Sequence, residues 1–161
     1  MQPTQAARFR LIMQILEPYF QKGELYLLHC NYGYLVFTSK RLHQVYGHVG
    51  NGQWQEIPDL FYFTLSYDAE DKDTLEEKGI ELEMWIYTDT ATRSAWSEKI
   101  SGKAGLGLIY RKKGFDLIYK KEILPLEERP EDYYANSEKL IVTIQRFLAE
   151  ELPEIENAIL A

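Results

Sequence analysis

Near both ends of the chain, apolar residues recur every three or four positions, as they do on one face of an amphipathic helix. The N-terminal set lies between the capping residue Thr4 and the helix-stopping residue Gly23: Phe9, Ile12, Met13, Leu16 and Phe20. The C-terminal set follows the capping candidates Asn136 and Ser137: Leu140, Ile141, Ile144, Phe147, Leu148 and Leu152. Pro153 ends this second helix or starts a further turn. Each helix needs an apolar surface to cover.

Between these helices, runs of aromatic and β-branched residues separated by turn signals predict antiparallel strands. The predicted strands span residues 25–30, 34–38, 42–49, 53–57, 60–67, 80–88, 105–111 and 115–121. Three turns join neighbouring strands into hairpins: Asn31-Tyr32-Gly33, Gly50-Asn51-Gly52 and Lys112-Lys113-Gly114. A short helix is predicted from about Ala91 to Ile100, capped by Asp89 or Thr90.

Strict alternation marks residues 80–88 as a strand with two different faces. One face is apolar: Ile80, Leu82, Met84 and Ile86. The other face is mixed: Glu81, Glu83, Trp85 and Tyr87. We expect the apolar face to lie in the core beneath Ile141, Ile144 and Leu148, and the mixed face to meet solvent or a site.

This order of elements predicts an α+β fold in which residues 1–161 form a single two-layer domain. The mostly antiparallel sheet carries an N-terminal helix, a short internal helix and a long C-terminal helix. A chain of 161 residues with 45% apolar and 14% aromatic content is sufficient for one continuous core. No apolar run approaches the roughly 18 to 20 residues that span a bilayer, so no membrane association is expected.

The single cysteine, Cys30, excludes an intramolecular disulfide framework and agrees with a reducing compartment. Cys30 ends an apolar run, and we expect it to be a buried structural thiol. Residues 1–10 lack the apolar stretch and the cleavage site of a signal peptide. A cytoplasmic protein is therefore expected.

Charge divides the chain unevenly. Residues 93–121 hold eight Lys or Arg against two acids, whereas the whole protein has a net charge of −7. Arg111, Lys112 and Lys113 stand at a predicted hairpin tip, with aromatic residues interleaved nearby. Cations beside aromatic rings are one means of holding single-stranded nucleic acid, so this segment is the one candidate surface for it. The acidic remainder of the chain repels phosphate, so the alternative interpretation of this segment is a surface for an acidic protein partner. Solvated surface lysines explain the same residues.

Aromatic content favours a binding role. Twelve Tyr and three Trp exceed what a domain of this size usually needs inside, and both types are enriched at interfaces. Tyrosines that line the edge of the core with their hydroxyls in water explain the same count. The leading interpretation is a small protein-binding or adaptor domain without catalytic activity or cofactor. Its predicted contact residues lie on the mixed strand face and at the basic tip: Trp85, Tyr87, Arg111, Lys112 and Lys113. A helper in secretion or assembly would also fit the acidic α+β composition.

A second interpretation rests on paired carboxylates. Glu81 and Glu83 project from one face of a predicted strand, and Asp59 or Asp68 precedes them on the neighbouring strand. This arrangement is similar to the E-x-E form of the PD-(D/E)xK nuclease family, and the order of elements over residues 60–111 resembles part of that fold. The resemblance implies a divalent-metal-dependent nuclease in which these carboxylates hold Mg²⁺ or Mn²⁺. The family's Lys has no counterpart here, and a solvated strand face explains the same residues.

Overall fold

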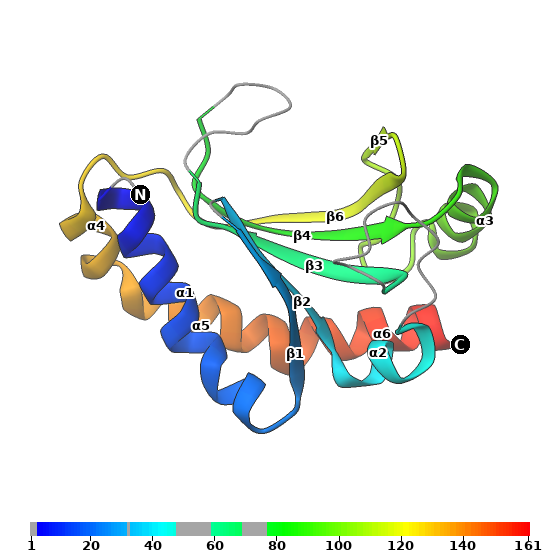
Figure 1. The fold of residues 1–161 in the computed structure, drawn as a ribbon, viewed down its shortest axis with the longest axis horizontal. Helices are drawn as coiled ribbons and strands as arrows, with labels where there is room; N and C mark the ends of the chain where they lie inside the picture. Colours follow the sequence, from blue (N-terminus) through cyan, green and yellow to red (C-terminus); the bar gives the residue numbers. More distant parts are fainter. Residues whose placement is uncertain (1–2, 32, 48–58, 69–76) are drawn as a thin grey trace.

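The computed structural model describes residues 3–31, 33–47, 59–68 and 77–161. These residues form an α+β fold whose six-stranded antiparallel sheet has the order β1-β2-β3-β4-β6-β5 (Figure 1). In that order, the strands are β1 (Leu25–Cys30), β2 (Tyr34–Ser39), β3 (Phe61–Ser66), β4 (Ile80–Tyr87), β6 (Phe115–Leu124) and β5 (Tyr110–Lys112). The strands β1 and β5 therefore form the two edges.

Most helices lie on one side of this sheet, and the chain termini lie at opposite ends of the molecule (Figure 1). The helices are α1 (Pro3–Gln21), α2 (Lys40–Tyr46), α3 (Thr90–Ile100), α4 (Pro130–Ala135), α5 (Ser137–Arg146) and α6 (Leu152–Leu160), with a π-helical turn η1 (Phe147–Glu151) between the last two. The predicted N-terminal helix, short internal helix and long C-terminal helical stretch are confirmed. The helix α4 was not predicted.

The core forms between the helices and the apolar face of β4. Ile80, Leu82, Met84 and Ile86 are at most 2% exposed and share one hydrophobic cluster with Ile144. Ile141 and Leu148, half-buried, pack against the same cluster. The predicted apolar face of this strand and its covering helix are therefore confirmed.

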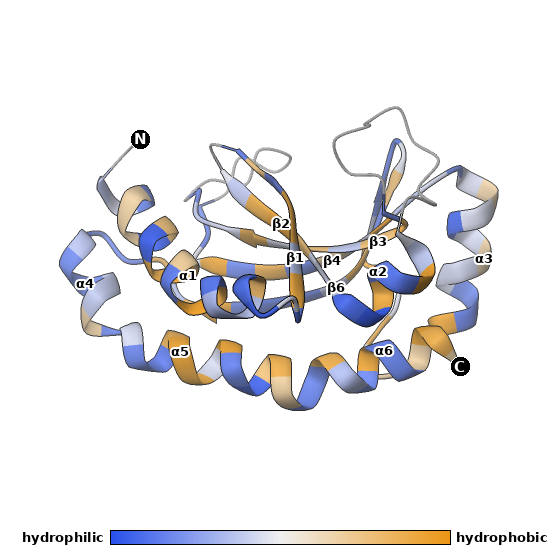
Figure 2. Ribbon diagram, turned by 60° about the horizontal axis from the view of Figure 1, so that its bottom comes forward, coloured by the Kyte–Doolittle hydropathy of each residue, from blue (hydrophilic) through white to orange (hydrophobic). Residues whose placement is uncertain are grey.

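The C-terminal helical stretch is amphipathic, with hydrophobic and hydrophilic residues alternating along α5 and α6 (Figure 2). Pro153 lacks an amide proton, so it cannot donate to the preceding turn. The π-helical turn η1 directly precedes this proline, and in it the N–H of Leu152 donates to the carbonyl of Phe147. Pro153 then stands in the first turn of α6. Of the two predicted alternatives, Pro153 therefore starts a further helical segment and does not end the helical stretch.

The first predicted hairpin is confirmed. Asn31 Oδ1 accepts hydrogen bonds from the N–H groups of Gly33 and Tyr34 at 2.8 and 3.0 Å. Such a side-chain bond closes the turn between β1 and β2. Cys30, in contrast, is exposed, with its sulfur 3.3 Å from the hydroxyl of Tyr67. The expected buried thiol is wrong: Cys30 is the last residue of the edge strand β1, whose first residue, Leu25, is the one that is buried.

The predicted strand over residues 42–49 is wrong, since residues 40–46 form α2 instead. Ser39 adopts an extended conformation and its side chain accepts a hydrogen bond from the N–H of Leu42, which starts the helix. Leu42 is then buried in the main core. The predicted turn at residues 50–52 and the predicted strand 53–57 lie outside the described residues.

The second face of β4 is buried as well. Glu81, Glu83, Trp85 and Tyr87 are between 3% and 9% exposed. A smaller hydrophobic cluster lies on this face, drawn entirely from strand residues: Val36, Tyr62, Trp85, Tyr87 and Leu117. The sequence predicted a face in contact with solvent or a site, and the structure instead has a second, aromatic core layer.

Candidate functional site

The hairpin formed by β5 and β6 is anchored by a buried carboxylate. Asp116 is 0% exposed and accepts hydrogen bonds from Arg93 Nε at 2.9 Å, from Ser97 Oγ at 3.1 Å, and from Arg111 through Nε at 2.9 Å and Nη2 at 2.8 Å. Arg93, 3% exposed, also donates to the carbonyl of Thr88. One acid thus joins helix α3 to both strands of the hairpin.

Burial alone would raise the pKa of Asp116, because it disfavours the charged form. Hydrogen bonds from Arg111, Arg93 and Ser97 outweigh this effect and hold the pKa of Asp116 below its ordinary value. The same contact raises the pKa of Arg111. Arg111, predicted as a contact residue at a solvated tip, therefore has its guanidinium committed to Asp116.

The predicted contact residues Trp85 and Tyr87 lie beneath the hairpin, where they are 9% and 3% exposed. Tyr87 stacks on Phe115 with ring centroids 4.6 Å apart. The indole N–H of Trp85 donates to Thr64 Oγ1 at 3.3 Å, and Lys112 Nζ lies 5.0 Å from the centre of the Trp85 ring. These contacts support the hairpin through aromatic stacking and a cation–π contact, while the two buried rings offer little surface of their own.

The hairpin carries an exposed apolar strip that the sequence analysis did not single out. Leu108, Ile109 and Tyr110 are 47%, 56% and 45% exposed in three consecutive positions. Tyr110 begins β5 and the other two residues precede it, so the strand predicted over residues 105–111 is shorter in the structure. The N–H groups of Gly107 and Ile109 donate to the carbonyls of Ile118 and Leu117 at 3.0 and 2.8 Å, which holds this strip along β6. The signal in the sequence was an unbroken apolar triplet directly before three basic residues.

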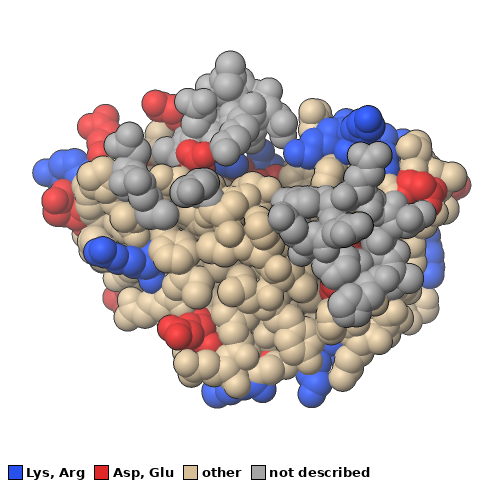
Figure 3. All heavy atoms as spheres, in the orientation of Figure 1, with Lys and Arg blue, Asp and Glu red and all other residues tan. Residues whose placement is uncertain are grey.

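We call residues 108–113 the edge segment, because they combine this apolar strip with the basic tip. Lys113 is exposed at the turn, and Lys112 is half-buried against the aromatic rings. Lys and Arg side chains gather in the upper right of the space-filling view, where Figure 1 places β5 (Figure 3). The edge segment is thus an apolar strip that ends in positive charge.

Lys120 and Lys121 do not extend this surface. Lys120 Nζ lies 3.4 Å from Glu81 Oε2, and Lys121 Nζ lies 2.7 Å from Glu151 Oε2. Successive residues of a strand point to opposite faces, so these two lysines lie on different sides of the sheet. The predicted basic segment is therefore divided among several ion pairs.

The four carboxylates of the nuclease interpretation lie at both ends of the sheet. Phe61 of β3 pairs with Ile86 of β4, and Leu65 pairs with Leu82. In this antiparallel register, Asp59 lies beside the C-terminal end of β4. Asp68, Glu81 and Glu83 lie at the N-terminal end of β4, so Asp59 is separated from the E-x-E pair.

Each of these carboxylates has a basic neighbour. Asp59 is 1% exposed, and its Oδ2 lies 2.7 Å from Nδ1 of His43. The buried Arg8 of α1 interacts electrostatically with both Asp68 and Glu81, and Glu83 lies 3.9 Å from Lys78 Nζ. Within the described ranges, no three His, Cys, Asp or Glu side chains come together as a metal-binding group.

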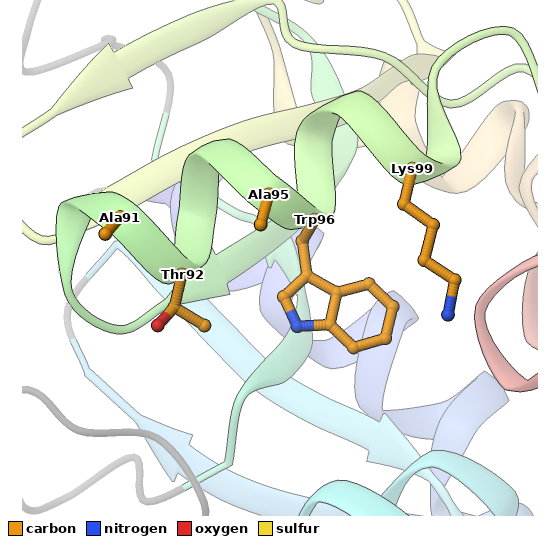
Figure 4. Close-up of a pocket in the computed structure, with 5 residues that line it drawn as sticks. All are labelled: Ala91, Thr92, Ala95, Trp96 and Lys99. Atoms are coloured by element: carbon orange, nitrogen blue, oxygen red, sulfur yellow. The ribbon is translucent and has the colours of Figure 1, made fainter.

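A shallow pocket of about 380 Å³ lies on α3 (Figure 4). Its described lining comes from one helix: Ala91, Thr92, Ala95, Trp96 and Lys99. Lys99 Nζ lies 4.7 Å from the centre of the Trp96 ring, and Thr92 Oγ1 already donates to Asp89. A small-molecule site needs several convergent polar groups, which this described lining does not offer.

The chain matches no family model, no curated protein and no solved structure. None of the described helices combines the length and the apolar character needed to cross a bilayer. Function is therefore inferred from the geometry of the described surfaces, among which the edge segment joins apolar exposure to positive charge.

Proposed function

We propose that this protein is a small cytoplasmic protein-binding domain that acts without catalytic chemistry and contacts its partner through the edge segment, residues 108–113. One observation carries the proposal: Leu108, Ile109 and Tyr110 expose between 45% and 56% of their surface in an unbroken row at the sheet edge. Successive side chains of an extended segment point to opposite sides, so Leu108 and Tyr110 expose apolar surface on one side of the edge and Ile109 on the other. Apolar exposure clustered in this way marks interaction sites on soluble proteins.

The position of the strip at a sheet edge strengthens the proposal. Natural proteins usually protect edge strands with charges, proline or bulges, because an open edge pairs readily with other chains. Here the protecting lysines stand only at the tip, and the preceding three positions carry no charge. The anchor at Asp116 and the aromatic support beneath Lys112 hold the hairpin in place, which lowers the entropy lost when a partner binds.

Selection of peptides from a random phage-displayed library on the immobilised protein tests this proposal. We expect the enriched peptides to bind Ile109→Asp about tenfold more weakly than wild type, because a charge replaces the most exposed aliphatic contact. Val142→Asp is the matched control, since Val142 on α5 is 46% exposed and lies outside the edge segment. Equal binding by both variants, or no enrichment at all, would refute the proposal.

We do not extend the proposal to a metal-dependent nuclease, because Asp59 lies away from Glu81 and Glu83 and each carboxylate has a basic neighbour. Calorimetric titration with Mg²⁺ or Mn²⁺ is expected to give no binding heat, and the protein is expected not to nick plasmid DNA. Metal binding accompanied by nicking that Glu81→Gln abolishes would reverse this expectation.

A further inference from the structure

We infer that the edge segment takes an extended, acidic peptide strand, which adds to the sheet beside β5. This inference rests on the proposed function and names the chemistry of the partner. Addition of a strand to an open sheet edge is a common mode of peptide recognition, in which main-chain hydrogen bonds supply affinity and side chains supply specificity.

The backbone of the edge segment is suited to this pairing. The N–H groups of Gly107 and Ile109 point into the sheet, toward Ile118 and Leu117. Because successive peptide groups alternate in an extended chain, the N–H of Leu108 between them points away from β6, toward the open edge. An incoming strand can accept this hydrogen bond and lay apolar side chains beside Leu108 and Tyr110.

The opposite edge is less suited to the same role. The pairing of β1 with β2 is interrupted by an irregularity between Leu27 and His29. Bulges of this kind twist an edge away from a regular register and protect it from pairing. At the start of β1, helices α1 and α2 also pack against the strand. The β5 edge is therefore better suited than the β1 edge to pair with an added strand.

Charge identifies the incoming strand as acidic. Arg111, Lys112 and Lys113 follow the apolar strip directly, and the nearest acid on the hairpin, Asp116, already serves both Arg93 and Arg111. Residues 110–117 of the hairpin therefore hold three cations against one acid. A strand that alternates apolar residues with Glu or Asp would complement both parts of the edge segment, with electrostatics acting mainly on association rate and specificity.

Two other occupants fit the same surface less well. Nucleic acid affinity depends on many phosphate contacts, yet Lys120 and Lys121 are paired with glutamates and the chain outside residues 93–121 has a net charge of −13. A second copy would bring together two molecules of net charge −7 and set one basic tip beside another apolar strip. An acidic peptide depends less on ionic contacts than nucleic acid does, because main-chain hydrogen bonds to the sheet edge supply part of its affinity.

Three fluorescent peptides of about eight residues test the inference. The first alternates Val with Glu, the second alternates Val with Lys, and the third is the first with a central Pro, which cannot donate to a strand ladder. At low salt, we expect the Glu peptide to bind about tenfold more tightly than either of the others. On binding, amide hydrogen exchange should slow at Leu108, whose N–H would then be paired.

Charge reversal provides the matched variants. Lys113→Glu is expected to weaken binding of the Glu peptide about fivefold at low salt, and the loss should shrink as salt screens the charges. Lys139→Glu, on the exposed surface of α5, makes the same change of net charge and is expected to leave binding unchanged.

The outcomes separate this inference from the proposed function. If the Lys peptide or the Pro peptide binds as tightly as the Glu peptide, the partner is not an acidic strand. Library-selected peptides that depend on Ile109 would still support a protein-binding domain in that case. A dimer in light scattering that Ile109→Asp dissociates would assign the edge to a second copy, and tighter binding of an oligothymidine would assign it to nucleic acid. Either result would overturn the inference.

Discussion

Replacement of Asp116 by Asn is expected to lower the free energy of unfolding by about 3 to 5 kcal/mol. Asp116 is fully buried, and so is its partner Arg93, at 3% exposure. Removing the carboxylate charge leaves the Arg93 guanidinium buried without its counter-charge, and this desolvation is the main cost. Urea unfolding, with the midpoint and the slope fitted together, measures the loss.

Asp132→Asn is the matched control for this substitution. Asp132 accepts hydrogen bonds from Nε and Nη2 of Arg129 at 3.1 and 3.0 Å, the same paired geometry that joins Arg111 to Asp116. Arg129, however, has a side chain that is 71% exposed, so water solvates it when the pair is broken. We expect little change in stability, as is usual for surface ion pairs. Equal losses for the two variants would show that burial of the Asp116 cluster is not what matters.

The difference in stability between wild type and Asp116→Asn is expected to depend on pH. Because the pKa of Asp116 is held below its ordinary value, its charge stabilises the fold fully above about pH 4 and progressively less as the pH falls through the folded-state pKa. The difference in stability between wild type and Asp116→Asn should therefore shrink in acid. A difference that stays constant or grows below about pH 4 would contradict the assigned cause.

Truncation of Leu82 to Ala is expected to destabilise the protein by about 2 to 5 kcal/mol. Leu82 is 2% exposed in the main core, on the strand between β3 and β6. Its removal loses buried apolar surface and leaves a cavity that paired neighbours on both sides cannot easily close, since Leu65 and Lys121 are fixed opposite it by strand pairing. Thermal and urea unfolding both report the change.

Leu27→Ala makes the same chemical change at the sheet edge, where Leu27 is 46% exposed. Much of that side chain is already in water, so we expect a small loss. If Leu82→Ala leaves the melting temperature unchanged, the assignment of β4 to the core is contradicted. A large loss from Leu27→Ala alone would instead point to a covered β1 edge.

The partner experiments depend on the same anchor. Because Asp116 joins Arg93 to Arg111, loss of the carboxylate is expected to loosen the hairpin that presents Leu108 to Tyr110. Peptide binding by Asp116→Asn, measured under conditions where the variant stays folded, should therefore weaken even though Asp116 makes no contact with a partner. This links the stability of the hairpin to the proposed function.

Periodic residue patterns alone were sufficient to predict α1, β4 and the C-terminal helices. Helical spacing and strand alternation are properties of local backbone geometry, so they can be read from neighbouring residues. The pattern was ambiguous at residues 42–49, where a strand and a helix both place apolar residues acceptably. Tertiary structure decided that case, because Leu42 is buried in the core when Ser39 caps a helix.

The candidate site depended far more on tertiary structure. The sequence shows eight cations in residues 93–121 but not their partners, since Arg93 lies 23 positions from Asp116 and Lys121 lies 30 positions from Glu151. Those pairings engage the Arg111 guanidinium with Asp116, which its position at a predicted turn did not indicate. Trp85 and Tyr87 of the mixed strand face likewise are buried through contacts with residues of other strands.

Exposure of the edge segment was also decided only by the fold. The sequence by itself determined that Leu108, Ile109 and Tyr110 are apolar and that a basic turn follows them. The exposure of such a triplet depends on which other elements cover each face of the sheet, and no local residue pattern specifies that cover. Tyr110 begins β5, the last strand in the sheet order, with Leu108 and Ile109 directly before it, and all three side chains are between 45% and 56% exposed.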